Sequence, residues 1–178
     1  MATIAETVAA LERHLGFDAA RCRTIIRKLI DAELIPSGAP GVAVEIGDPE
    51  FAMVIIALAA APSLRKAADT VATYDEMTPS GVWREGMPIR RTSAFEYLVD
   101  AVHAACGDLD AQKAVSGLLF EFCETWPEMA VHSPDGTSRF VSAGADSAHW
   151  QSGKQRRATT ISGTALIQCA RELFTEKH

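Results

Sequence analysis

The amino-acid sequence predicts a mainly α-helical protein with one small β-hairpin. Apolar residues recur every three or four positions along most of the 178-residue chain, which is the period of amphipathic helices. Capping boxes, in which Thr or Ser precedes Glu by three positions, mark helix starts at Thr3 and Ser93. Only residues 129–142, around Pro134 to Gly136, have the pattern of a hairpin. The length suits one domain, or two small domains that share a core.

Two short amphipathic helices are expected at the N-terminus. The first begins at the capping box of Thr3 and Glu6 and stops at Gly16, because glycine readily ends a helix. Asp18 is a good cap for the second helix, which must end before the Pro- and Gly-rich run at 36–41. A glycine in the short turn between them lets the helices meet at a steep angle. This arrangement is typical of a helix-turn-helix.

The middle of the chain predicts a short strand followed by two helices. Apolar residues alternate over 42–46, as in a strand. Asp48, Pro49 and Glu50 then supply a cap, a proline in the first turn and an acid near the positive helix end. The helix that they open, over 49–61, is apolar on every side, so we expect it in the core or between subunits. Another helix is expected to run from Pro62 to about Met77.

The C-terminal half predicts three more helices around the hairpin. Pro and Gly residues indicate a loop over 78–92, and a polar stretch covers 144–155. Asp108 is the expected cap of the second of these helices. The remaining elements are expected as helices at 93–106, 108–123 and 162–174, the hairpin at 129–142 and a strand at 157–161.

Composition limits the possible functions and locations. The net charge of −6 argues against a protein that coats nucleic acid nonspecifically, so any DNA contact must come from a local cluster of cations. The four cysteines form no C-x-x-C motif and lie among apolar residues, which is typical of buried thiols in a reducing compartment. The N-terminal residues lack the pattern of a signal peptide, and the longest apolar run, 51–61, is too short to cross a membrane. We therefore expect a cytoplasmic protein without membrane contacts.

The second predicted helix carries an unusual concentration of positive charge. Between Ala19 and Ile30 there are four cations and no anion, in a chain that is acidic as a whole. On a helical projection the apolar residues cover one half, and small and basic residues cover the other. A helix of this kind fits the major groove of DNA, where small and polar side chains approach bases and cations neutralise phosphates. The expected base-facing residues are Ala20, Thr24 and Arg27, and the expected phosphate contacts are Arg21, Arg23 and Lys28.

Residues 3–46 resemble winged helix-turn-helix DNA-binding domains. The resemblance is carried by Leu15-Gly16-Phe17, by 21–29 as the recognition helix and by 31–38 as the start of the following strand. The whole chain is also similar to a loosely defined group of phage and prophage proteins from alphaproteobacteria. The resemblance implies a winged helix-turn-helix at 1–46, a helical body at 47–178 and double-stranded DNA as partner. Two positions depart from the pattern: Glu12 lies at the helix crossing, and the wing at 38–47 contains no Lys or Arg.

These features lead to a hypothesis of DNA recognition without catalysis. Because a single recognition helix binds weakly, we expect a homo-oligomer. A transcription regulator and a packaging subunit similar to a small terminase both fit; a dimer would favour the first and a ring the second. The acidic balance and the absence of Lys and Arg from the wing keep an alternative open, in which the domain binds another protein in an interaction or virion-structural role.

Other groups of residues give weaker signals. Two basic clusters in expected loops could supply auxiliary phosphate contacts, meet an acidic partner or simply stay solvated. We expect Glu121, Glu124 and Glu128 on a solvated helix face. No pair of histidines has metal-ligand spacing, and nucleophile-elbow and phosphate-loop motifs are absent, so neither a metal, a cofactor nor an enzyme is expected. The two basic clusters are Arg84, Arg90 and Arg91, and Lys154, Arg156 and Arg157.

Overall fold

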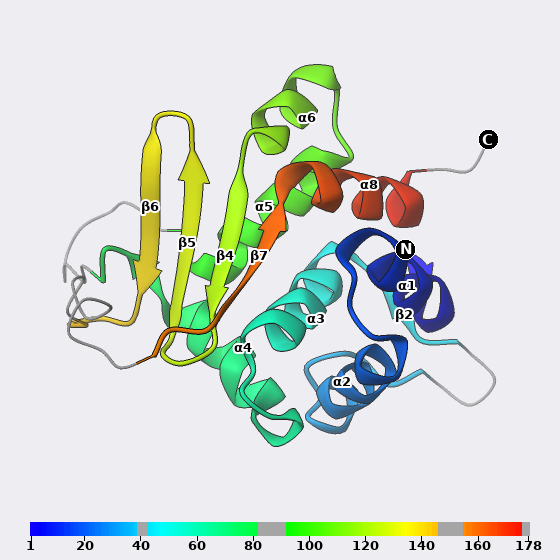
Figure 1. Ribbon diagram of the computed structural model, residues 1–178. Helices are drawn as coiled ribbons and strands as arrows, with labels where there is room; N and C mark the ends of the chain where they lie inside the picture. Colours follow the sequence, from blue (N-terminus) through cyan, green and yellow to red (C-terminus); the bar gives the residue numbers. More distant parts are fainter. Residues whose placement is uncertain (39–42, 82–91, 146–154, 176–178) are drawn as a thin grey trace.

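The fold is mixed α/β, with helices packed against one face of a five-stranded antiparallel sheet (Figure 1). The computed structural model describes residues 1–38, 43–81, 92–145 and 155–175. In chain order the elements are β1 (Ala2–Thr3), α1 (Ile4–Ala10), the π-helical turn η1 (Leu11–Leu15), α2 (Ala19–Asp31), β2 (Glu45–Ile46), α3 (Asp48–Ala60), the 3-10 turn η2 (Leu64–Lys66), α4 (Ala67–Glu76), β3 (Thr78–Pro79), α5 (Ala94–Ala105), α6 (Leu109–Ser116), β4 (Leu119–Cys123), β5 (Glu128–Ser133), β6 (Gly136–Val141), β7 (Ala158–Ser162) and α8 (Gly163–Phe174).

The expected mainly α-helical fold with one small hairpin is therefore wrong. The hairpin exists as β5 and β6, and the strand near 157–161 exists as β7, but both belong to a sheet with the order β3-β6-β5-β4-β7. A two-stranded hairpin alone would leave two open edges, and pairing with β4, β7 and β3 satisfies those backbone groups. The sheet brings together segments that are far apart in the sequence, which local periodicity does not register.

The helix expected over 108–123 is the largest single error. Asp108 caps a helix as expected, accepting hydrogen bonds from the backbone nitrogens of Asp110 and Ala111 at 3.1 and 2.9 Å. That helix, α6, ends at Ser116, and the chain continues as strand β4. Phe120 and Phe122 point to the helices and are fully buried, whereas Glu121, between them, faces the other side of the sheet. Over so few residues, an apolar run fits the period of a helix as well as that of a strand.

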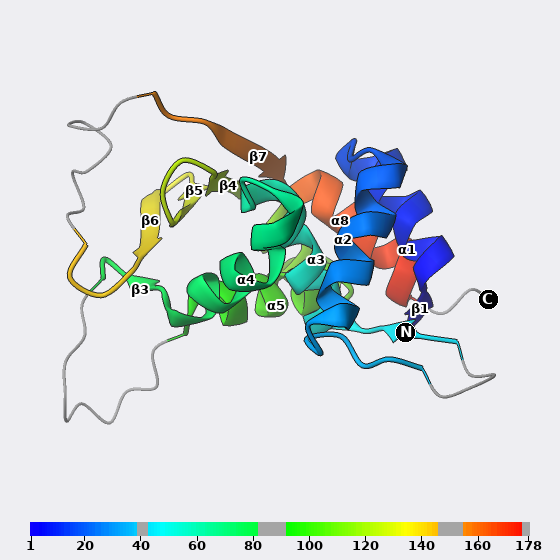
Figure 2. The same ribbon diagram turned by 90° about the horizontal axis from the view of Figure 1, so that it is seen from below.

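Aromatic contacts join the inner face of the sheet to the helices that cover it. Tyr74 of α4 stacks on Phe122 with ring centroids 6.2 Å apart, and Tyr97 of α5 contacts Phe140 of β6 at 5.3 Å. Because Tyr74 is buried, its hydroxyl needs a partner, and it donates to the carbonyl oxygen of Glu128 at 2.9 Å. Figure 2 shows α4 and α5 on one side of the strands.

Helix α3 lies in the centre of the core, as its all-apolar sequence predicted. Its residues from Phe51 to Ala60 are buried, apart from the half-buried Met53. Phe51 contacts Phe174 of α8 edge to face, with ring centroids 5.5 Å apart. The buried cluster runs from Ala2 to Leu173, so the N-terminal helices and the sheet are connected through α3. Among the described helices, none has both the length and the apolar character needed to span a bilayer.

The predicted pair of N-terminal helices is present, and later parts of the chain, β2 and α8, are joined to this region by hydrogen bonds. Thr3 and Glu6 form the expected capping box, and Gly16 adopts a left-handed conformation with φ of 73°, which ends the helix. β1 pairs with β2 in an antiparallel ladder, so the segment before α3 returns to the N-terminus. On α8, Glu172 accepts hydrogen bonds from His14 at 2.7 Å and Arg13 at 2.6 Å, and these two partners lower the pKa of the Glu172 carboxyl.

The cysteines provide a test of the core. Burial, with a smaller contribution from nearby carboxylates, raises the pKa of Cys22 to about 11 and that of Cys169 to about 12, and both side chains are fully buried. Cys106 is only half-buried. Because the thiolate is the reactive form, iodoacetamide at about pH 8 should label Cys106 well before Cys22 and Cys169 in the native protein. Mass spectrometry of peptides at timed intervals measures this order.

The urea-unfolded chain is the control for the labelling experiment, since all four thiols should then react at similar rates. Labelling of Cys22 or Cys169 in the native protein as fast as that of Cys106 would contradict the packing described above.

Candidate nucleic-acid interface

Helix α2 exposes the face that the sequence predicted. Asp18 caps it by accepting a hydrogen bond from the backbone nitrogen of Arg21 at 2.7 Å. The apolar half, formed by Cys22, Ile25, Ile26 and Leu29, is buried. Of the six candidate DNA contacts, Thr24 is half-buried and the other five are exposed: Ala20, Arg21, Arg23, Arg27 and Lys28. Most of the polar flank of α2 is thus left uncovered by the described part of the molecule.

The exposed cations differ in the ion pairs and hydrogen bonds that they already form within the protein. Arg23 and Arg27 form no ion pair with any described residue. Lys28 lies 3.6 Å from the Asp31 carboxylate, an exposed pair that contributes little energy and can be exchanged for a phosphate. Arg21 directs a guanidinium nitrogen to two backbone carbonyls at the end of α3, those of Leu58 and Ala61, each at 3.4 Å. Arg21 therefore partly serves to cap α3.

Thr24 is less available than its hydroxyl group suggests. The hydroxyl donates to the carbonyl oxygen of Ala20 at 2.9 Å, so its hydrogen is engaged within the helix. Its oxygen can still accept a hydrogen bond, and its methyl group can contact a thymine methyl. Ala20, Thr24 and Arg27 follow one another at helical spacing on the exposed side.

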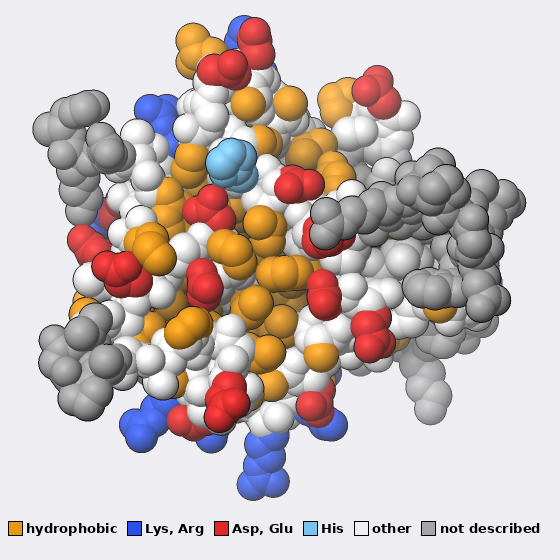
Figure 3. All heavy atoms as spheres, turned by 180° about the vertical axis from the view of Figure 1, so that it is seen from behind, with side chains coloured by type: hydrophobic (Ala, Val, Ile, Leu, Met, Phe, Trp, Pro, Cys, Tyr) orange, Lys and Arg blue, Asp and Glu red, His pale blue; other side chains and the backbone are white. Residues whose placement is uncertain are grey.

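Two cations that the sequence analysis did not assign to this interface lie beside it. Arg65 and Lys66 belong to η2, which packs against α2, and both are exposed. Lys66 pairs with Asp69 at 2.8 Å, and this partner raises the pKa of the lysine. In Figure 3 the Lys and Arg side chains gather along the lower edge, where Figure 1 places α2 and the start of α4. The Arg65-Lys66 dipeptide was visible in the sequence, but only packing placed it next to α2.

The expected wing provides no cation in the described residues. Residues 39–42 lie outside the described part of the chain, and β2 presents Glu45 as an exposed side chain. β2 pairs with β1, as the register of Ile46 with Ala2 shows. Apart from Arg13 of η1, which pairs with Glu172, the Lys and Arg residues within 1–46 all lie on α2.

The auxiliary basic clusters are only partly described. Arg84, Arg90, Arg91 and Lys154 lie outside the described residues. Arg156 turns onto the outer face of the sheet, where it pairs with Glu121 at 3.0 Å and Glu128 at 3.1 Å and lies over the Trp126 ring at 5.7 Å. Arg157 is exposed and lies 3.5 Å from Glu124. Arg156 is thus engaged in an ion-pair network and is not directed away from the protein.

That network corrects the expectation of a solvated acidic helix face at 121–128. Glu128 is only 2% exposed and accepts hydrogen bonds from Trp126, Arg139 and Arg156. Glu121 accepts from the His132 ring at 2.9 Å. These residues come from β4, β5, β6 and the segment before β7, so their proximity depends on the sheet register, in which Glu121 faces Ala130 and Ala130 faces Arg139. The two-residue period of a strand, applied to the residues of β4, was the one signal in the sequence that could have indicated this ion-pair network.

The described residues contain no group of three or more His, Cys, Asp or Glu side chains that could hold a metal ion. Comparisons of the chain with protein-family models, with curated proteins and with solved structures give no match. The exposed cations of α2 and η2 are therefore the features that bear on function.

Proposed function

We propose that this protein binds double-stranded DNA through the exposed face of α2, without catalysing a reaction. The observation that carries the proposal is the availability of Arg23, Arg27 and Lys28 on the solvent side of a capped helix. The helix has 13 residues and is about 20 Å long, and its exposed ridge can enter a major groove about 12 Å wide. The resemblance of 3–46 to DNA-binding helix-turn-helix domains supports the same role.

In this proposal the side chains divide into two functions. Arg27 reaches a base edge, where a guanidinium pairs with guanine, and the small Ala20 and Thr24 allow the helix to approach. Arg23 and Lys28 contact phosphates on either side of the groove, and Arg65 of η2 extends the contact along the backbone. Because one recognition helix gives limited affinity, specific binding needs two or more copies of the chain. A dimer would favour a phage- or prophage-type regulator, and a ring would favour a packaging subunit.

Binding of a labelled duplex, measured by fluorescence anisotropy from about 50 to 200 mM salt, tests this proposal. Each phosphate contact contributes a slope of about −0.9 in a plot of log affinity against log salt. Lys28→Ala should therefore reduce the slope by about one and weaken binding to all sequences alike. Arg27→Ala should weaken binding to the preferred sequence by about 5- to 150-fold and relax selection at one base position, as found by selection from a random duplex pool.

Lys113→Ala is the matched control, because Lys113 is an exposed lysine on α6 that pairs with an acid three positions away, as Lys28 does. This variant should bind DNA as the parent protein does. If duplexes of many sequences show no binding at low salt, the proposal is wrong. A protein that binds but loses nothing in Arg27→Ala and Lys28→Ala would place the contact elsewhere, which also contradicts it.

A further inference from the structure

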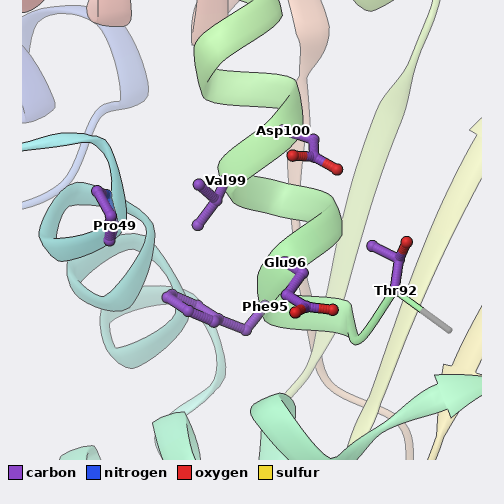
Figure 4. Close-up of a pocket in the computed structure, with 6 residues that line it drawn as sticks. All are labelled: Pro49, Thr92, Phe95, Glu96, Val99 and Asp100. Carbon is purple, nitrogen blue, oxygen red and sulfur yellow. The ribbon is translucent and has the colours of Figure 1, made fainter. Parts of the chain in front are cut away.

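A groove on the side of the molecule opposite the sheet separates the start of α3 from the first turns of α5. Its volume is about 280 Å³, and its described lining residues are Pro49, Thr92, Phe95, Glu96, Val99 and Asp100. Figure 4 shows the Phe95 and Val99 side chains on the side of α5 nearer Pro49. The groove is thus formed by two helices whose lining residues are more than forty positions apart.

Two parallel rows of side chains run along α5 beside the groove. Phe95 and Val99 are four positions apart and half-buried, so they form an apolar row along the helix. Glu96 and Asp100 follow them by one position each and form an acidic row. Asp100 is exposed and has no partner among the described residues. One carboxylate oxygen of Glu96 accepts a hydrogen bond from the backbone nitrogen of Ser93, 3.0 Å away. The carboxylates of the acidic row can therefore pair with cations of another molecule.

The charged side chains among the described residues around the groove have mostly the same sign. Figure 3 shows this face, on which hydrophobic side chains gather in the middle with Asp and Glu among and around them, and Lys and Arg lie at its margins. The described residues that line the groove include no Lys or Arg. Asp48, at the start of α3, adds a further carboxylate close to the groove and lies 3.5 Å from His103 of α5. A cationic partner is attracted to such a face, and an anionic one is repelled.

The size of the groove and the kinds of side chain that line it both bear on which cationic partner fits. Its volume is slightly below the range of about 300–1,000 Å³ that is typical of small-molecule sites. The described residues offer no cluster able to hold a metal ion. Side chains of a protein segment fit better, because one apolar side chain can enter between Phe95 and Pro49 while flanking cations reach the acidic row.

We propose that this groove docks a basic, amphipathic segment of a partner protein. An apolar side chain of the partner contacts Phe95 and Val99, and Lys or Arg residues about one helical turn apart pair with Glu96 and Asp100. The surface is distinct from α2, which presents cations rather than anions. The protein would then carry a DNA-binding face and a protein-binding face, each with its own charge.

Selection of binders from a library of short random peptides, displayed and captured on the full-length protein, tests this proposal. Enriched peptides should combine Lys or Arg with Leu, Ile or Phe at helical spacing. A peptide from this pool, labelled with fluorescein, should bind at least about fivefold more weakly to Asp100→Asn and to Val99→Ala, because each variant removes one of the two kinds of contact. Its affinity should fall as salt rises.

Asp110→Asn, which removes an exposed acid on α6, is the control and should bind the peptide as the parent protein does. Far-UV circular dichroism and urea unfolding confirm that each variant is folded. The proposal is overturned if no peptide depends on Asp100 and Val99, or if acidic peptides are enriched. It is also overturned if sedimentation shows that Asp100 mediates self-association, because the occupant is then a second copy of the chain.

DNA binding through α2 and docking of a basic segment in the groove can each be contradicted without the other. Asp100→Asn should leave DNA binding unchanged, and Arg27→Ala should leave peptide binding unchanged, since Asp100 belongs to α5 and Arg27 to α2.

Discussion

Replacing Gly163 by alanine is expected to destabilise the protein by about 3 kcal/mol or more. A Cβ atom at this position would lie 1.8 Å from the carbonyl oxygen of Val115 and 2.8 Å from its carbonyl carbon. Gly163 is the first residue of α8, and its backbone nitrogen donates to the carbonyl oxygen of Leu118 at 2.7 Å. The start of α8 therefore touches the end of α6 backbone to backbone. A methyl group can enter only if one helix moves, and overpacking of this kind costs about 1–3 kcal/mol or more.

Urea unfolding followed by circular dichroism measures this loss. With a slope of about 2 kcal/mol per molar urea, a loss of 3 kcal/mol lowers the midpoint by about 1.5 M. Gly117→Ala is the matched control, because Gly117 ends α6 and the nearest atoms to its added Cβ are in Pro134, at 3.9 Å. This variant should be neutral or slightly more stable, since alanine restricts the unfolded chain. Equal midpoints for the two variants would show that α6 and α8 do not approach as described.

Replacing Glu128 by alanine is expected to cost about 3 kcal/mol. The carboxylate is buried and forms ion pairs with the Arg139 and Arg156 guanidinium groups. The ring nitrogen of Trp126 also donates a hydrogen bond to it at 3.1 Å. Removal of one member of a buried ion pair costs about 3–5 kcal/mol, because the remaining charge loses its counter-charge in a region of low dielectric. The guanidinium side chains are 28% and 24% exposed, so water can replace part of the lost interaction and the lower end applies.

Glu124→Gln is the matched control for Glu128→Ala. Glu124 pairs only at 3.5 Å with Arg157, whose side chain is 61% exposed, and such a surface pair contributes about 0–1 kcal/mol. Glu128→Gln should fall between the two variants, because it keeps the shape and hydrogen-bonding capacity of the side chain but loses its charge. All three are compared by urea unfolding. If Glu128→Ala is no less stable than Glu124→Gln, the carboxylate is not the centre of the network.

The candidate DNA interface was largely predictable from the sequence. The exposed side chains of α2 are set by helical period and by the cap at Asp18, and both act over a few residues. The sequence did not reveal that Arg21 turns to the carbonyls at the end of α3, or that Arg65 lies beside α2. Those positions depend on how α2, α3 and η2 pack, and no local pattern records that packing.

The sheet and the surfaces that depend on it were not predictable in the same way. Phe120 and Phe122 contribute to an apolar run that suits a helix or a strand, and the choice is made by pairing with β5 and β7. The burial of Glu128 follows from that register, because its partners come from other strands. The groove between α3 and α5 likewise exists only when the two helices pack.

The sequence by itself determined the helix starts at Thr3, Asp18, Ser93 and Asp108, the hairpin and the cationic face of α2, because caps, turns and amphipathic period are properties of neighbouring residues. The helix expected from Pro62 instead begins at Ala67, after the turn η2, and the helix expected to be capped by Asp48 has Gly47 as its N-cap. The tertiary structure decided that residues 119–123 form a strand, that Glu128 is buried and that an acidic groove borders α5. The physical reason is range: a helix satisfies its backbone hydrogen bonds within four residues, whereas a strand depends on partners that can be distant in the chain.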